Sequence, residues 1–361
     1  MTSSSNIEQL LDSLARIDPG DALVLSIYLD LRPHASGERP GLRTAQIVLK
    51  DRLREIEKTL LPRGQALDDF RADVARVDHF LVEHAEPWLA GVALFACHQL
   101  GLFESLESGV PFDDQVVLEP RPDLFQLARL IDEYETAVVA LVDTNTARLF
   151  VSRRGFVDER AGPDVATRFT RRRDSGGLNQ KRYQRRVENR RFDFAKEVAQ
   201  ELEDVVVHEG ATRVILAGDA VAIPLLHQTL SPELEPMVSE QVLRLDIRSS
   251  PSDVAEEIKP LLADIEAEES HSAATRLIDA VREQGLGVLG EQETRDALTH
   301  GQADTLVLAE EAPLGTTERS DLVRLATLSG ARVETVAGGS NELRDMGGVG
   351  ALLRYRVSWV H

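Results

Sequence analysis

Apolar positions in the first third of the chain follow two different spacings. Residues 7–17, 43–61 and 66–86 place apolar side chains three or four positions apart, which predicts amphipathic helices. Residues 22–29 and 91–96 are short and almost continuously apolar, which predicts buried strands. Helices mixed with strands in this way predict an α/β fold.

Two prolines, Pro120 and Pro122, interrupt this pattern before a second group of elements. Residues 124–134 predict a short helix. Apolar runs at 137–143 and 147–151, separated by a three-residue polar turn, predict a β-hairpin. The α/β pattern therefore continues beyond the prolines.

A long polar stretch occupies the middle of the chain. Residues 153–180 are rich in arginine and have no apolar periodicity, so they predict a loop. Residues 181–207 return to helical spacing and predict a long helix. Further strands are expected at 213–217 and 243–247.

The last part of the chain begins with a helical pattern at residues 253–284, with Pro260 as a candidate break. Within it, residues 266–269 are read as a solvated helix face or a linker. Beyond Gly285 helices and strands alternate, which predicts a small α/β domain. The elements expected there are helices at 291–299 and 321–329 and strands at 305–308 and 332–336, followed by three glycines at 347, 348 and 350 and by residues 351–357.

The length of 361 residues exceeds what one hydrophobic core usually supports. The breaks in the pattern predict three domains. Residues 1–133 form an N-terminal α/β domain of unknown target, 134–268 a middle α/β domain with the long basic loop, and 269–361 a small C-terminal α/β domain.

Composition excludes several classes of protein. The single cysteine, Cys97, can form neither an internal disulfide nor a cysteine-rich zinc site. The nine histidines show no His-x-x-x-His or His-Glu-x-x-His spacing, so we expect no metal site and no cofactor. The first residues lack the pattern of a secretory signal, and no apolar run reaches the roughly 18 residues of a membrane span. These features predict a cytoplasmic protein with no membrane partner.

The charge of the chain is unevenly distributed. Its formal net charge is −20, yet residues 168–196 contain eleven Lys and Arg against three acidic residues. An acidic protein with one concentrated basic segment can dock that segment on a polyanion and repel it elsewhere. A nucleic acid is the partner that the charge predicts for this segment, and the family resemblance described below implies RNA and not DNA.

The helix predicted at 181–207 has two opposite faces. Its apolar stripe contains Tyr183, Val187, Phe194, Val198, Leu202 and Val205. Its basic face contains Lys181, Arg182, Arg185, Arg186, Arg190 and Lys196. Arg191 is an exception, since it falls on the apolar stripe. One face is therefore expected to pack on the domain while the other contacts phosphates.

The loop before this helix contains Gly176-Gly177-Leu178-Asn179-Gln180, preceded by Arg171, Arg172 and Arg173. Paired glycines allow close approach of another backbone, and a glutamine amide both donates and accepts hydrogen bonds. Gln180 could therefore orient a water molecule against an ester. The residues alone leave three readings open, namely nucleic-acid docking, catalysis and a plain solvated loop.

Three stretches together carry a resemblance to a known family. They are residues 176–191, with the glycine loop and basic helix, residues 303–310, and the glycine-rich ending at residues 347–357. In this order and spacing they resemble the archaeo-eukaryotic class-1 peptide-chain release factors. That family includes Pelota and the peptidyl-tRNA hydrolases of ribosome quality control.

The resemblance implies a three-domain, release-factor-like architecture. The middle domain would carry the loop to ribosomal RNA at the peptidyl transferase centre, where peptidyl-tRNA is bound. Gly176 and Gly177 match the glycines of the family's loop, and Gln180 matches its catalytic glutamine. Two residues separate the glycines from Gln180, as in rescue-type members, which leaves Asn179 as an alternative working amide. The C-terminal domain would resemble kink-turn-binding ribosomal proteins and contact partners such as a translational GTPase.

These features support two main hypotheses for function. The first is codon-independent hydrolysis of peptidyl-tRNA in ribosome rescue or translation quality control. Residues 1–130 contain no Asn-Ile-Lys-Ser motif for reading stop codons, which favours a factor that acts regardless of the codon. The second is a non-catalytic Pelota-like or dormancy factor that occupies the ribosomal A site. An RNA chaperone unrelated to the ribosome is a third, weaker reading.

Overall fold

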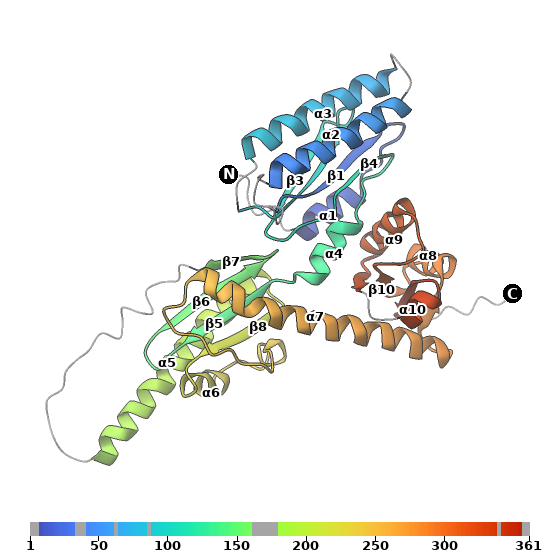
Figure 1. Ribbon diagram of the computed structural model, residues 1–361. Coiled ribbons are helices and arrows are strands. Elements are labelled where there is room, and N and C mark those ends of the chain that lie inside the picture. The colour runs from blue at the N-terminus through green and yellow to red at the C-terminus, as the bar shows by residue number, and fades with distance from the viewer. Residues whose placement is uncertain are drawn as a thin grey trace. The chain divides into compact units, whose positions relative to one another are not determined.

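The structure is a computed structural model that describes residues 7–32, 41–60, 64–84, 88–160, 180–337 and 341–355. The chain forms two compact units, the first from Met1–Glu133 and Glu266–His361 and the second from Tyr134–Ile265 (Figure 1). The first unit thus joins the two ends of the chain. The division into three domains stays a prediction.

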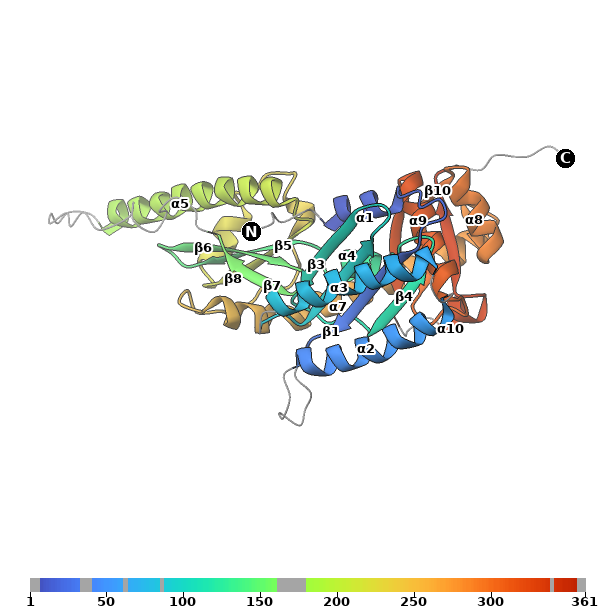
Figure 2. The ribbon, with the colours of Figure 1, turned by 90° about the horizontal axis from the view of Figure 1, so that it is seen from above.

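An antiparallel sheet of order β3-β2-β1-β4 forms one part of unit 1. Its strands β1 and β2 are buried on both faces, as their continuous apolar runs predict. Helices α2 and α3 pack on one face of the sheet (Figure 2), while Tyr28 and Phe95 share a core with α1 and α4. The bounds are α1 (Ile7–Ala15), β1 (Val24–Asp30), α2 (Gly41–Thr59), α3 (Gln65–His84), β2 (Gly91–Cys97), β3 (Leu102–Ser108), β4 (Gln115–Glu119) and α4 (Phe125–Glu133).

A mixed sheet of order β11-β10-β12-β9 forms the other part of unit 1. Strand β10 pairs in parallel with β11 and antiparallel with β12. The same hydrophobic core that contains α1 and α4 continues through this sheet and α9, which explains why both chain ends belong to one unit. The bounds are β9 (Gly287–Leu289), α8 (Glu291–Thr299), β10 (Ala303–Ala309), α9 (Thr316–Ser329), β11 (Arg332–Val336), α10 (Asn341–Asp345) and β12 (Val349–Leu353).

Unit 2 is a sheet of order β7-β6-β5-β8 between two layers of helices. Val138, Ala140 and Val142 of β5 face α5 and α6, while the alternate residues of β5 face the start of α7. This alternation is the two-residue period of a strand that is covered on both faces. The bounds are β5 (Ala137–Val142), β6 (Ala147–Arg153), β7 (Phe156–Glu159), α5 (Gln180–Glu209), β8 (Arg213–Gly218), α6 (Ala222–His227) and α7 (Pro251–Arg282).

The predicted α/β class and hairpin are confirmed. Strands β5 and β6 are antiparallel, with Val142 opposite Ala147. The Asp143 carboxylate accepts hydrogen bonds from the backbone N–H groups of Asn145 and Thr146, both at 2.6 Å. An acidic side chain that binds the following amides in this way stabilises a tight turn.

Some sequence-based predictions are wrong. Residues 243–247 are not a strand, since Leu243 makes only an isolated bridge to Ala217, and its apolar neighbours instead pack on the α7 side of the sheet. Strand β7 lies inside the predicted loop, and β3 and β4 were not predicted. These strands are only partly buried, so their apolar pattern is weak.

Pro260 does not break α7, which continues for 32 residues. A proline inside a helix costs about 3 kcal/mol, because it removes a hydrogen bond and crowds the preceding turn. Here Val254, Ile258 and Leu261 are buried against the sheet on both sides of the proline, which offsets that cost. None of the described helices, α7 included, has the length and apolar character needed to cross a membrane.

Candidate functional site

The predicted loop site lies largely outside the described residues. The residues of this site that are not described are Gly176, Gly177, Asn179 and the arginines Arg171, Arg172 and Arg173. Gln180 is the first residue of α5, and the first two turns continue with Lys181, Arg182, Arg185 and Arg186. Only the backbone of these five residues is described, so the roles assigned to their side chains stay predictions.

Helix α5 is anchored to unit 2 by its C-terminal half. Among the side chains that are described, burial begins at Phe194 and recurs as far as Val206. With a rise of 1.5 Å per residue, the helix from Gln180 to Phe194 spans about 20 Å. Figure 1 shows this part of α5 extending beyond the sheet of its own unit. The helix therefore begins well away from the core, directly after the glycine loop.

The apolar stripe of α5 is confirmed over its described part. Phe194, Val198, Leu202 and Val205 are all buried in the core of unit 2. Arg191, the exception on this stripe, is half-buried and lines a crevice of about 10 Å³, room for roughly one water molecule. Its position shows that the stripe begins to leave the core near this residue.

The opposite face of α5 presents cations to solvent. Arg190 and Lys196 are exposed and make no ion pair with any side chain that the structure describes. The Lys196 ammonium lies 4.7 Å from the centroid of the exposed Phe192 ring, a cation–π contact. A carboxylate would have neutralised these charges, so they remain available to an anionic partner.

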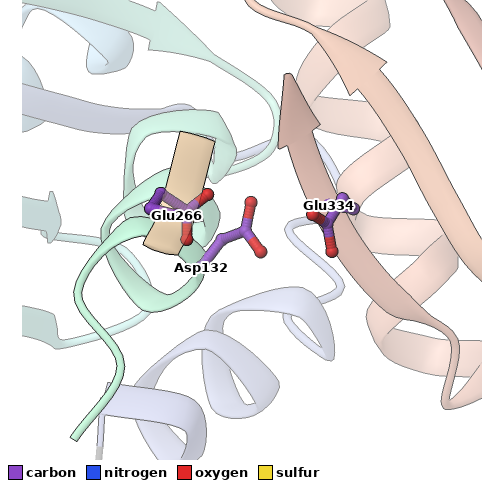
Figure 3. A group of neighbouring side chains, drawn as sticks. All are labelled: Asp132, Glu266 and Glu334. Atoms are coloured by element: carbon purple, nitrogen blue, oxygen red, sulfur yellow. The ribbon is translucent and has the colours of Figure 1, made fainter. Parts of the chain in front are cut away.

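Three carboxyl groups meet in unit 1, at a place that the sequence does not reveal. Asp132, Glu266 and Glu334 come from α4, α7 and β11, and one carboxylate oxygen of each lies within 4.8 Å of the others (Figure 3). The chain leaves unit 1 directly after Glu133 and returns at Glu266. The group therefore lies where both connections to unit 2 begin.

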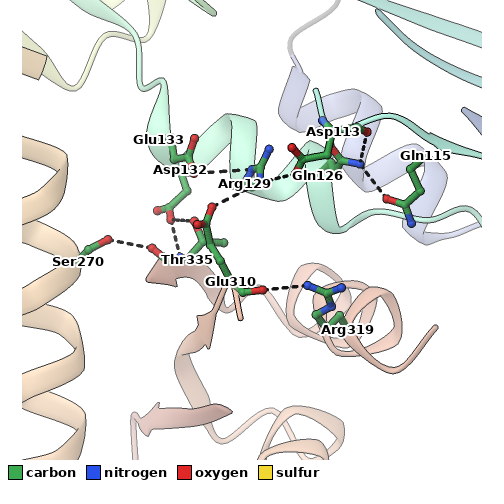
Figure 4. Close-up of polar contacts among 10 residues, drawn as sticks. All are labelled: Asp113, Gln115, Gln126, Arg129, Asp132, Glu133, Ser270, Glu310, Arg319 and Thr335. Atoms are coloured by element: carbon green, nitrogen blue, oxygen red, sulfur yellow. Dashed lines mark hydrogen bonds and ion pairs between the residues drawn. The ribbon is translucent and has the colours of Figure 1, made fainter. Parts of the chain in front are cut away.

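Hydrogen bonds connect Asp132 of this cluster, and the neighbouring helix α7, to β11, the edge strand of the sheet β11-β10-β12-β9 (Figure 4). The hydroxyl of Thr335 donates to Asp132 Oδ2 at 2.7 Å, and the Thr335 N–H donates to the same oxygen. Ser270 Oγ donates to the carbonyl oxygen of Thr335 at 2.8 Å. Helices α4 and α7 are thereby attached to β11.

Burial favours the neutral forms of these acids. It raises the pKa of Asp132 to about 8, and the negative charges of Glu334 and Glu266 act in the same direction. Burial likewise raises the pKa of Glu266 to about 7 and that of Glu133 to about 7. Arg129 opposes the rise at Glu133, from which its Nε lies 3.7 Å away. Asp132, Glu266 and Glu133 therefore tend to keep their protons near neutral pH.

Carboxylate oxygens at this spacing are also a donor set that hard cations use. Such a cation would have to displace the retained protons, because the neutral acids are poor ligands. The absence of a metal site in this chain therefore stays a prediction.

Comparison with known proteins shows which proteins this chain resembles in sequence. The model of the bacterial archaeo-eukaryotic release factor family 10 matches residues 122–261, which contain α4, the loop and most of unit 2. The pelota homologue of Thermococcus kodakarensis is 26% identical over 191 residues, covering 50% of this chain and 54% of that protein. The chain is thus similar in sequence to Pelota and release-factor-like proteins. It spans about half the length of the curated relatives it matches.

Two solved structures align over much of this chain. One is a model of ribosome-bound archaeal Pelota and ABCE1, at 17% identity, 99% coverage of this chain, 96% of that chain and a TM-score of 0.45. Another is Saccharomyces cerevisiae Dom34, at 12% identity, 72% coverage of this chain, 75% of that chain and a TM-score of 0.43. The similarity rests on the sequence matches, since superpositions this loose add no argument.

Proposed function

We propose that this chain is a Pelota-like factor of ribosome rescue or translation quality control, which binds the ribosome through the basic segment at 168–196. The family match over residues 122–261 is the observation that carries this proposal, because it contains the unit that presents this segment. A ribosomal factor of this kind would work in the cytoplasm.

The build of α5 supports RNA docking. The helix is held by its buried C-terminal half, so its first turns can enter a groove without disturbing the core of unit 2. Arginines and lysines on those turns would bind phosphates and release counterions. The remainder of the chain carries a net charge of −28, which would limit binding to that one segment.

Hydrolysis of peptidyl-tRNA is the second candidate activity. Two features of the sequence favour it: Gly176 and Gly177 shortly precede α5, and Gln180 is the first residue of that helix. Gln180 would orient a water molecule whose oxygen adds to the ester carbonyl carbon. The bond from that carbon to the ribose oxygen of the tRNA then breaks, and the proton of the water passes to that oxygen. A factor that only occupies the ribosome has no chemical need for Gln180.

Segment 269–361 is the part we propose for contact with a protein partner, with a translational GTPase as the candidate. The resemblance of residues 303–310 and 347–357 to the third domain of the release factors supports this assignment. The three-domain division at residues 133 and 268 belongs to the same proposal.

Equilibrium binding to stalled ribosomes over a range of salt concentrations tests the docking proposal. We expect the affinity to fall steeply with salt, with a log–log slope of several units, and to drop when Lys181, Arg182, Arg185 and Arg186 are replaced by alanine. A flat salt response, or unchanged affinity in this variant, would refute docking through the basic segment.

Release of labelled peptide from the same ribosomes separates the two candidates. If the chain is a hydrolase, the wild type releases peptide while Gln180→Ala binds equally well and does not. A parallel Asn179→Ala variant identifies which amide works. Tight binding without release by the wild type assigns the chain to the non-catalytic factors.

A further inference from the structure

A cavity of about 370 Å³ opens in unit 1, between the segment after β4 and the helices α8 and α9. Its volume falls in the range of small-ligand sites, which begins at about 300 Å³. Val117, Pro120 and Pro122 form apolar parts of its wall, and the remaining lining is strongly charged. None of these residues belongs to the basic segment proposed to dock on RNA.

Three guanidinium groups lie around the carboxylate of Asp321 beside this cavity, and one of them, that of Arg295, also pairs with Glu291 at 3.2 Å. Arg324 donates from Nε and Nη2 to Asp321 Oδ1, at 3.1 and 3.0 Å, and Arg295 donates to Asp321 Oδ2. The third, Arg121, has a nitrogen 3.8 Å from Asp321, too far for a hydrogen bond. The side chains of Arg324, Arg295 and Arg121 are 18%, 27% and 53% exposed, so solvent reaches all three.

These three arginines lie close together in a unit whose residues are mostly acidic among the charged types. The two segments of unit 1 contain 39 acidic residues against 22 Lys and Arg. Each guanidinium has five N–H donors, and Arg121 makes no hydrogen bond with any residue that the structure describes. An anion with several oxygens would use these donors.

The other acidic residues of the lining are arranged so that they leave room for such an anion. Both carboxylate oxygens of the buried Asp123 accept hydrogen bonds, from Gln115 Nε2 and from the Phe125 N–H. The carboxylate of Glu318 folds back over Gly315 at the start of α9. Glu119 is the remaining acid, and it can accept a hydrogen bond from a ligand.

We propose that this cavity binds a nucleoside monophosphate unit, with its phosphate on Arg121, Arg295 and Arg324. The apolar wall of Val117, Pro120 and Pro122 suits the face of a base, and Glu119 suits a base N–H group. Guanidinium groups bind phosphate through paired, charge-assisted hydrogen bonds. The unit can be a free nucleotide or the 5′-terminal nucleotide of an RNA, since both have this chemistry. The site goes beyond the proposed function and needs no ribosome.

Calorimetric titration of the full chain tests this site. The probes are AMP, GMP, CMP, UMP, inorganic phosphate, and a short RNA with either a 5′-phosphate or a 5′-hydroxyl group. We expect saturable binding of at least one monophosphate, tighter than inorganic phosphate. Preference for the phosphorylated RNA over the free nucleotides would identify an RNA end as the source, and the reverse would identify a free nucleotide.

Arg121→Ala is the informative variant, because its weak contact with Asp321 makes it dispensable for folding. Its affinity for the nucleotide should fall about tenfold or more. Arg71→Ala is the matched control, an exposed arginine of unit 1 with one ion pair, and it should bind as the wild type does. Absence of saturable binding by the wild type, equal affinity for inorganic phosphate, or equal affinity of the Arg121→Ala variant would overturn the proposal.

Discussion

Replacing Asp132 by asparagine should make the stability of the protein less dependent on pH. Burial raises the pKa of Asp132 from an ordinary value of 3.8 to about 8. Between pH 5 and 7 the folded protein therefore retains a proton that the unfolded chain has lost. Stability must fall as pH rises through this window, because the unfolded state binds fewer protons. Asparagine has the same shape, and its oxygen can still accept from Thr335.

The size of the effect follows from one proton. A difference of one bound proton changes the free energy of unfolding by about 1.4 kcal/mol per pH unit. Asp132→Asn removes this contribution, so its stability relative to the wild type should increase by about 3 kcal/mol from pH 5 to pH 7. Glu266 and Glu133 add to the slope in both proteins, which is why the difference is the quantity to measure.

Urea unfolding followed by circular dichroism at pH 5, 6, 7 and 8 provides the measurement. Asp78→Asn, at an exposed aspartate of α3 in the same unit, serves as the control and should track the wild type. A difference between wild type and Asp132→Asn that stays constant from pH 5 to pH 7 would show that Asp132 is ionised in the folded state, and would refute the reasoning.

Three further outcomes are expected from single substitutions in unit 2. Phe194→Ala should lower the free energy of unfolding by about 3–5 kcal/mol, measured by urea unfolding, because it removes a ring that is buried in the core of unit 2. Gly218→Ala should cost about 3 kcal/mol or more in the same assay, because Gly218 has φ +117° and an added Cβ would meet the carbonyl oxygen of Val142. Arg190→Ala should reduce the log–log salt slope of ribosome binding by about one, whereas the exposed Arg248→Ala in the same unit should not; equal slopes would remove Arg190 from the RNA-binding surface.

Sequence reasoning succeeded where one local pattern decides the structure. The stripe of Phe194, Val198, Leu202 and Val205 repeats at helical spacing, so both the helix and its buried face were predictable. The turn at Asp143 was predictable for the same reason, since it depends on neighbouring residues alone. Pro260 was misleading because a tertiary core, which the local sequence does not display, holds the helix on both sides of it.

Features built from distant residues could not be predicted in this way. Asp132, Glu266 and Glu334 are separated by 134 and 68 positions and meet only because α4, α7 and β11 pack together. Glu266 lies in a stretch read as a solvated helix face or a linker, and both readings are wrong for Glu266, which is a half-buried residue of α7. The cavity beside Arg121 is likewise lined by residues that are far apart in the sequence, at 117–123 and at 295–324. The spacing of apolar residues within a short segment does not show which distant residues will be brought together by the fold.

Competition for the ribosomal A site tests the central claim most directly. Stalled ribosomes are prepared with the A site empty or filled by a tRNA, and the amount of the full chain that sediments with each is measured. The account predicts binding to ribosomes with an empty A site and little binding to those with a filled one. Equal binding to both, or binding to neither, would contradict a Pelota-like role for this chain.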